Sequence, residues 1–173
     1  MTGPSEPRGN PTDSGGSWVY PINLAEASRF AAAAHRGQVD KAGRPYVEHV
    51  YAVRDGLAPA GELMQIAGVL HDIVEDTPVT LDELRLMRVP EEVVRAVDSV
   101  TRRPDETYMD LVRRAAADPI GRVVKLADNL HNSSEARLAL LPREQAERLR
   151  RKYAKARVVL EAALDHPYPP VTT

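Results

Sequence analysis

The chain has 173 residues, of which 43% are hydrophobic and 5% aromatic, and a formal net charge of −2. This length is enough for one domain with one core, and so small a net charge gives no electrostatic reason to expect a nucleic acid or an anionic membrane as partner. The sequence contains no cysteine, which excludes disulfides and thiolate-ligated zinc, and it has no apolar run of the length that spans a bilayer.

The start of the chain differs in composition from the remainder. It is rich in proline, glycine, serine and charge, so it cannot bury enough apolar surface to order itself, and it lacks the apolar stretch of a secretory signal. We predict a disordered tail over residues 1–20, one domain over 21–166, a short C-terminal tail over 167–173, and a cytoplasmic location.

Helix signals dominate the predicted domain. Capping boxes at Asn23–Glu26 and Thr80–Glu83 mark two helix starts, Pro90 suits a first helical position, and Asp118–Pro119 reads as an N-cap followed by a first-turn proline. Apolar residues recur at helical spacing, and no segment alternates as a half-buried strand does. The sequence therefore predicts an all-α fold, with helices over 23–37, 46–57, about 61–77, 80–87, from 90, 107–117, from 118, and 142–164.

An imidazole and a carboxylate stand side by side at the end of an apolar run. His71 and Asp72 directly follow the run over residues 63–70. Burying such a pair is costly unless something compensates, and a divalent metal does so by turning both groups into ligands. Glu75 and Asp76 come four residues after them, one turn further along a predicted helix. The segment is therefore predicted to form a functional site.

Two more polar residues lie on apolar helical faces. His49 lies on the apolar side of the predicted 46–57 helix, and Asp128 closes the apolar stretch 123–127. With His71 and Asp72 they would offer a cation two imidazoles and two carboxylates, a set that suits Mn²⁺, Fe²⁺, Co²⁺ or Zn²⁺ better than Ca²⁺ or Mg²⁺.

Such a cation would polarise a phosphoryl oxygen and lower the pKa of a bound water. Glu75 and Asp76 would be near enough to exchange protons with that water or with a leaving group. The predicted reaction is hydrolysis of a phosphate ester or diphosphate ester.

The order His49, His71–Asp72, Asp128 resembles the H…HD…D pattern of the HD-domain metal-dependent phosphohydrolases. The resemblance is closer to the hydrolase domain of RelA/SpoT-type enzymes and to the stand-alone small alarmone hydrolases, which include the metazoan SpoT homologue. The matching segments between about 24 and 132 are 33–38 (AAHRGQ), Lys41, 45–46 with His49, 70–77 (LHDIVEDT) and 124–132 (VKLADNLHN).

This resemblance implies a compact HD-type helical bundle with a metal site at its centre and Mn²⁺-dependent removal of the 3′-diphosphate of (p)ppGpp. The implied partner is a small nucleotide, with no nucleic acid and no membrane; an oligomeric state is not implied. The implied site residues are His49, His71, Asp72 and Asp128 as metal ligands, Glu75 and Asp76 for handling water and protons, and Lys41 and Asn132 as nucleotide contacts.

Two positions depart from the family's pattern. Asp40 stands where the family usually has an arginine that packs on the guanine, and Ser133–Ser134 stand where an apolar residue and an arginine commonly follow. Both changes remove positive charge, so we expect weaker binding of a multiply phosphorylated guanosine and stronger binding after Asp40→Arg. The alternatives are a phosphatase of another nucleotide, such as a nucleoside monophosphate or a 2′- or 3′-phosphorylated dinucleotide, and a nucleotide-binding regulatory module without turnover.

Three further features have two interpretations each. His35 either stabilises a helix C-terminus or supports the site, and Lys125 either faces solvent or contacts phosphate. The basic run over 148–157 is interleaved with glutamates, which favours a solvated helix face over a nucleic-acid surface.

Overall fold

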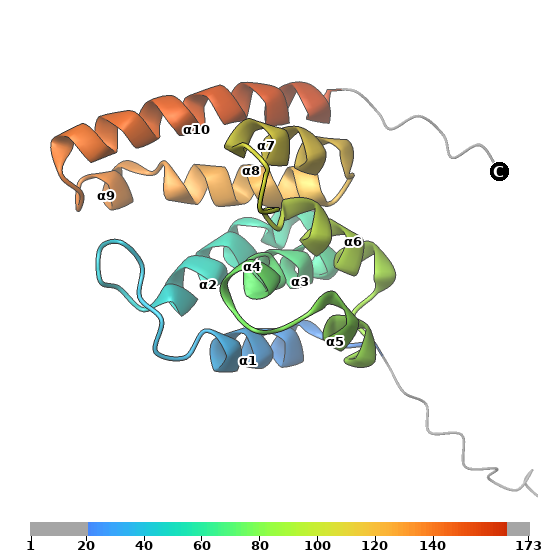
Figure 1. Cartoon of the computed structure of the whole chain (residues 1–173). Helices are drawn as coiled ribbons and strands as arrows, with labels where there is room; N and C mark the ends of the chain where they lie inside the picture. Colours follow the sequence, from blue (N-terminus) through green and yellow to red (C-terminus); the bar gives the residue numbers. More distant parts are fainter. Residues whose placement is uncertain (1–20, 166–173) are drawn as a thin grey trace, which may run out of the picture.

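The computed structural model describes residues 21–165, which form helices joined by loops, with no strand among them (Figure 1). The predicted all-α fold is confirmed. Both predicted tails lie outside the described residues. The elements are α1 (Leu24–Ala34), α2 (Tyr46–Gly56), the 3₁₀ turn η1 (Ala58–Ala60), α3 (Glu62–Leu70), α4 (Ile73–Asp76), α5 (Leu81–Leu86), α6 (Glu91–Val100), α7 (Tyr108–Ala117), α8 (Gly121–Asn132), α9 (Glu135–Leu138) and α10 (Arg143–Leu164).

The helix starts follow the local capping signals. The side chains of Asn23 and Thr80 each accept a hydrogen bond from the backbone N–H three residues later. Their own backbone N–H groups donate to the side chain of the glutamate at that position, so both predicted capping boxes form. Pro90 is the N-cap of α6 rather than its first helical residue, so this helix begins one residue later than predicted. The Asp118 carboxylate accepts from the N–H groups of Ile120 and Gly121, although the regular part of α8 begins only at Gly121.

The predicted continuous helix over 61–77 is wrong. α3 ends at Leu70 and α4 starts at Ile73, with His71 and Asp72 in the turn between them. In an unbroken helix, adjacent side chains point about 100° apart around the axis. The turn instead allows both side chains to reach one centre. The short elements η1 and α9 were also absent from the sequence-based prediction.

The helices form two groups that meet at α8. α7, α8 and α10 pack together in the upper part of Figure 1, α1, α2 and α3 pack together below them, and α6 contacts both groups. α8 touches α2, α3, α6, α7 and α10. The main core beneath it is built from valine, leucine, isoleucine and alanine, as the scarcity of aromatic residues indicates.

Gly68 lies where α3 packs against the end of α2. A Cβ at this position would lie 2.5 Å from Leu57 Cδ1 and 3.4 Å from the Arg54 backbone. The glycine therefore leaves room for the Leu57 side chain between α2 and α3. The packing of these two helices brings His49 of α2 and His71 after α3 to the same side of α8. No helix within residues 21–165 is both long and apolar enough to cross a membrane.

Candidate metal centre

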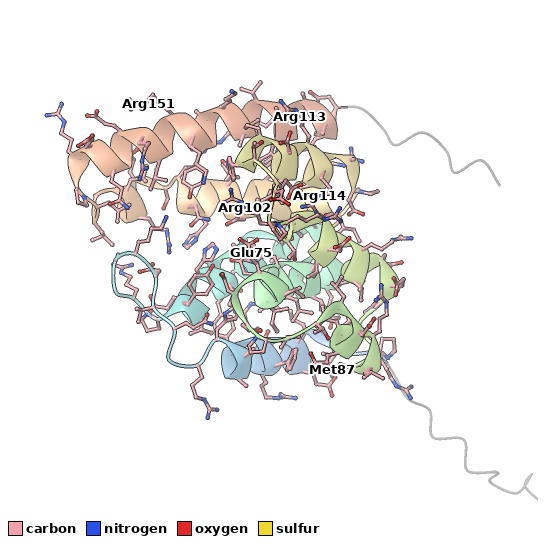
Figure 2. All side chains as sticks on the ribbon, in the orientation of Figure 1. Glu75, Met87, Arg102, Arg113, Arg114 and Arg151 are labelled. Carbon is pink, nitrogen blue, oxygen red and sulfur yellow. The ribbon has the colours of Figure 1, made fainter. Side chains whose placement is uncertain are left out.

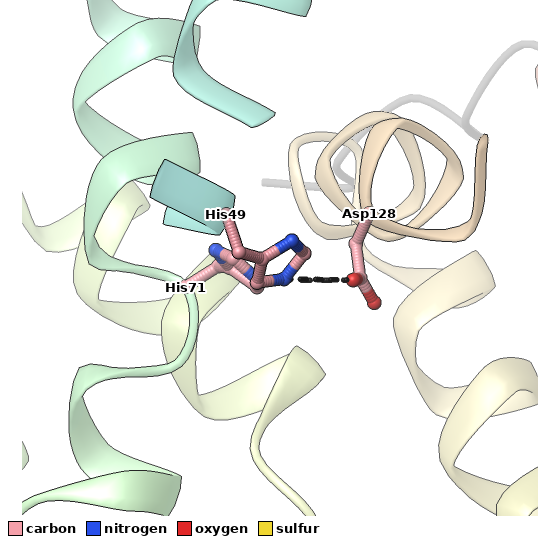
Figure 3. Close-up of side chains that lie close together, drawn as sticks. All are labelled: His49, His71 and Asp128. Carbon is pink, nitrogen blue, oxygen red and sulfur yellow. Dashed lines mark ion pairs between the residues drawn. The ribbon is translucent and has the colours of Figure 1, made fainter. Parts of the chain in front are cut away.

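Four predicted ligands from three parts of the chain meet below α8. His49 comes from α2, His71 and Asp72 from the turn after α3, and Asp128 from α8, and all four are buried. His49 Nε2 lies 3.4 Å from Asp72 Oδ2 and 3.3 Å from Asp128 Oδ1, and His71 Nε2 lies 2.8 Å and 3.9 Å from the same two oxygens. Figure 3 shows the two imidazoles beside one another with the Asp128 carboxylate facing them.

The protonation of His71 is fixed by its own helix. Its Nδ1 lies 2.8 Å from the carbonyl oxygen of Gly68, which can only accept, so Nδ1 carries a proton and Nε2 is the ring nitrogen that faces the two carboxylates. Nε2 is buried without a hydrogen-bond partner within the described part of the chain, because its short contact with Asp72 Oδ2 lacks hydrogen-bond geometry. A buried ring nitrogen this close to a carboxylate oxygen, with no hydrogen bond between them, fits a shared cation, so the donor set could hold a divalent metal.

The centre keeps both carboxylates ionised. Burial alone would raise the pKa of Asp72, but the adjacent His71 and His49 hold it well below its usual range. Burial would likewise raise the pKa of Asp128. Lys125, whose Nζ lies 2.8 Å from Asp128 Oδ2, instead lowers the pKa of that carboxyl below its usual range. Lys125 is itself buried, so it does not face solvent. The site therefore combines two buried negative charges, which favours a cation.

The imidazole of His131 contacts that of His49. The two imidazoles are stacked, with centroids 4.9 Å apart, and their Nδ1 atoms are 2.7 Å apart. Burial, together with the neighbouring His49 and Arg137, lowers the pKa of His131 to about 4, so His131 is neutral near pH 7. A neutral His131 can accept the Nδ1 proton of His49, which leaves His49 Nε2 available as a ligand.

Tyr46 orients the carboxylate of Asp72. Its hydroxyl donates to Asp72 Oδ2 at 2.6 Å, and burial followed by the charge of Asp72 raises the pKa of Tyr46, so the phenol keeps its proton. Neither Tyr46 nor His131 was singled out from the sequence. The available signal was spacing, because Tyr46 lies three residues before His49 and His131 three residues after Asp128, each on the same helical face as a predicted ligand.

Glu75 and Asp76 lie beside this centre. Glu75 Oε2 accepts a hydrogen bond of 2.8 Å from the backbone N–H of Arg102, and Figure 2 shows these two residues next to each other between the two groups of helices. Burial, with the nearby charge of Asp72, raises the pKa of both carboxyls above their usual values. Carboxyls with raised pKa values at a cleft are suited to proton exchange.

Two consecutive hydrogen bonds connect His35 to the backbone of Asp76. His35 Nδ1 donates to Gln38 Oε1 at 2.7 Å, and Gln38 Nε2 donates to the Asp76 carbonyl at 2.7 Å. His35 is buried and its ring lies 5.2 Å from that of Tyr46. Of its two interpretations, the contacts favour support of the site.

A cavity of about 430 Å³ opens above the centre. Its lining includes seven of the eight predicted site residues: Lys41, His49, Asp72, Glu75, Asp76, Asp128 and Asn132. The eighth, His71, lies behind them. Asn132 donates a hydrogen bond to Asp128 Oδ1, so it holds a candidate ligand as well as facing the cavity. Four further cations, Arg102, Lys125, Arg137 and Lys152, also line the space, so cationic side chains surround the acidic groups.

The chain matches the family model of the HD domain over residues 27–158. It belongs to the HD-domain family. The resemblance to SpoT-type hydrolases is confirmed as well. A solved structure described as a metazoan ortholog of SpoT that hydrolyzes ppGpp is similar to this HD domain with a TM-score of 0.66 and 27% identity, covering 85% of this chain and 94% of that one.

Curated relatives of this HD-domain chain carry related names. The human guanosine-3′,5′-bis(diphosphate) 3′-pyrophosphohydrolase MESH1 is 38% identical over 122 residues, which cover 63% of this chain and 66% of that protein. The GTP pyrophosphokinase of Streptomyces coelicolor is 38% identical over 149 residues, which cover 80% of this chain and 16% of that protein. This HD-domain chain therefore spans only a small part of the longer relatives.

Proposed function

We propose that this HD-domain protein is a divalent-metal-dependent phosphohydrolase that removes the 3′-diphosphate of (p)ppGpp. The observation that carries the proposal is the buried, unpaired His71 Nε2 facing Asp72 on the floor of a cation-rimmed cavity. The substrate is suggested by the names of the human and Aquifex aeolicus relatives, both guanosine-3′,5′-bis(diphosphate) 3′-pyrophosphohydrolases. The proposal includes residues 21–166 as the hydrolase domain, a small nucleotide as partner and a cytoplasmic location.

The metal in this proposal is Mn²⁺, held by His49, His71, Asp72 and Asp128. A mixed set of two imidazoles and two carboxylates is typical of first-row transition metals. When bound, the cation supplies Lewis-acid polarisation of the phosphoryl group and lowers the pKa of a bound water.

The protein's own groups would move the protons and stabilise the phosphates. Glu75, fixed by the Arg102 backbone, would take a proton from the attacking water, and Asp76 would protonate the departing 3′-oxygen. The bond between the 3′-oxygen and phosphorus breaks, giving guanosine 5′-diphosphate and diphosphate from ppGpp and water. Lys41 and Asn132 would contact the nucleotide, and Lys125 and Arg102 would offset the charge of the reacting phosphoryl group.

One observation favours a second candidate, a phosphatase of a different nucleotide. The cavity loop carries Asp40 instead of the arginine that the family's pattern leads us to expect. A changed base-contacting wall would change the nucleotide while leaving the metal centre as it is.

A substrate panel tests the proposal. Mn²⁺-loaded protein is incubated with ppGpp, pppGpp, GMP and a 3′-phosphorylated dinucleotide, and the products are separated by chromatography. We expect guanosine 5′-diphosphate and diphosphate from ppGpp. Orthophosphate release from another member of the panel, with ppGpp unchanged, would instead support the second candidate.

Elemental analysis tests the ligand set. Wild-type protein and the exposed-site control Asp55→Asn should retain near-stoichiometric metal after dialysis, whereas His71→Ala should lose it. Stoichiometric metal in His71→Ala would remove this residue from the ligand set.

A further inference from the structure

One wall of the cavity is formed by two segments that are far apart in the sequence. Residues 39–42 of the loop before α2 line it from one side, and Arg137, Leu140 and Leu141, in and just after α9, line it from the other. Figure 1 shows this loop and α9 facing one another at the left of the molecule. This wall is more apolar than the rest of the lining, because Val39, Leu140 and Leu141 belong to it.

The Asp40 carboxylate is fully engaged within this wall. Its Oδ1 accepts from the backbone N–H groups of Ala42 and Arg44 at 2.8 Å and 3.0 Å, and its Oδ2 lies 3.1 Å from Arg137 Nη1. Its side chain is only 6% exposed. The sequence-based expectation that Asp40 would present an uncompensated charge to the substrate therefore does not agree with the geometry.

Arg137 brings a guanidinium to this wall from a different element. The ion pair with Asp40 restrains the side chain, which is 21% exposed and lines the cavity. A restrained, flat cation on a wall that also carries aliphatic side chains fits the face of a heteroaromatic ring, through cation–π and dispersion contacts. Arg102 and Lys125, which also line the cavity, are left to contact the phosphates.

We propose that Arg137 contacts the base of the bound nucleotide and that Asp40 is the positioning residue that holds it there. The proposal rests on the proposed function only in taking the ligand to be a nucleotide. In this arrangement a guanidinium reaches the cavity wall from α9 although the loop has none at position 40.

Binding measured with and without the base tests this role. The 173-residue chain, in a Glu75→Gln background with Mn²⁺, is titrated by calorimetry with guanosine 3′,5′-bisphosphate and with 1,2-dideoxyribose 3,5-bisphosphate, which has both phosphates and no base. Chromatography afterwards checks that the nucleotide is intact. Arg137→Ala should raise the Kd of the nucleotide roughly 2- to 30-fold, the range expected for a lost cation–π contact, and leave that of the base-free compound unchanged.

The outcomes separate the base role from a phosphate role. Equal losses for both compounds would mean that Arg137 acts on phosphate, and no loss for either would mean that it does not bind ligand; each result overturns the proposal. Arg137→Lys, which keeps the charge but not the plane, should lose affinity for the nucleotide nearly as Arg137→Ala does. Arg113→Ala, at an exposed ion pair on α7, is the control and should bind both compounds as the parent does.

The positioning role of Asp40 has its own test. Asp40→Asn keeps an acceptor for the two loop N–H groups and removes the charge that holds Arg137, so it should weaken nucleotide binding without affecting the base-free compound. Because Asp40 acts through Arg137, the double variant should bind no more weakly than Arg137→Ala alone. Additive losses would show that Asp40 acts independently. Asp40→Arg should weaken binding, because it places a second guanidinium against Arg137.

The proposed function can fail without this inference failing. If wild-type protein leaves ppGpp intact while Arg137→Ala still shows the base-dependent loss, the reaction is wrong and the base contact remains. If ppGpp is hydrolysed and Arg137→Ala binds the nucleotide normally, the reaction remains and the base contact is wrong.

Discussion

Two clusters of charged side chains lie where the helix groups of this protein meet, one partly buried and one buried, and they differ in how fully their polar atoms are paired. In the first, Arg114 of α7 donates to the carbonyl oxygens of Asp98, Ser99 and Thr101 at 2.7–2.9 Å and to the Glu106 carboxylate at 2.6 and 2.9 Å. In the second, His71 Nε2 faces Asp72 without a hydrogen bond.

The difference separates a structural network from a site. A fully paired network stabilises one arrangement, here the connection between α6 and α7, whereas an unpaired buried polar atom is costly unless a ligand compensates. Loss of a member should therefore cost stability at the Arg114 cluster, and activity or metal at the His71 cluster.

The largest expected effect is on turnover. Glu75→Gln should lower kcat about 10²- to 10⁴-fold, the usual contribution of a general acid–base group, and leave metal content unchanged. Steady-state release of diphosphate and elemental analysis measure the two quantities. Glu91→Gln, at an exposed ion pair with Arg85, is the control and should keep wild-type turnover. Wild-type turnover in Glu75→Gln would mean that another group handles the water.

At the Arg114 cluster we expect a loss of stability rather than a loss of turnover or metal. Arg114→Met should lower the free energy of unfolding by about 3 kcal/mol, because the Glu106 carboxylate and three carbonyls lose the hydrogen bonds that Arg114 donates. Urea denaturation measures the change. Metal content should stay at the wild-type value, and a loss of metal in this variant would show that the two clusters are coupled.

Metal addition examines the unpaired cluster directly. Mn²⁺ at about 100 times its Kd should raise the free energy of unfolding by about 2.7 kcal/mol in the wild type. The same gain is expected in Arg114→Met, because distant sites add, and none in His71→Ala. Thermal unfolding with and without Mn²⁺ measures the gain. A gain in His71→Ala would locate the stabilising metal elsewhere.

The Arg114 cluster should also make the free energy of unfolding depend on pH. The hydrogen bond and charge of Arg114 lower the pKa of Glu106 below its ordinary 4.5, despite an opposing contribution from burial. The stability that Glu106 contributes is therefore present above pH 4.5 and is lost as the pH falls through the lower pKa of the folded state. Wild type should exceed Glu106→Gln in unfolding free energy at pH 7, and the difference should shrink below pH 4.5. A constant difference would contradict this assignment.

The smallest effect is expected one residue away from Arg114. Arg113 forms an exposed ion pair with Asp110, its side chain is 62% exposed, and Figure 2 labels both arginines on α7. Arg113→Ala should change the free energy of unfolding by no more than about 0.5 kcal/mol. A loss comparable to that of Arg114→Met would show that the loss in both variants comes from α7 itself rather than from the buried contacts.

The sequence by itself determined the helical class, several helix starts and the candidate ligands. A capping box depends on residues three apart, as at Asn23 and Thr80, so the sequence contains all of its parts. The same holds for His71 and Asp72 at the end of an apolar run, because their predicted burial follows from neighbours in the sequence.

Only the tertiary structure decided how these residues meet. The stacking of His131 on His49, the burial of Lys125 and the pairing of Asp40 with Arg137 depend on segments that lie far apart in the chain. Such contacts follow from packing against α8 and α9, and local spacing contains no information about them. For that reason the residues that gather at the candidate metal centre could be predicted from the sequence, whereas the surroundings of Asp40 could not.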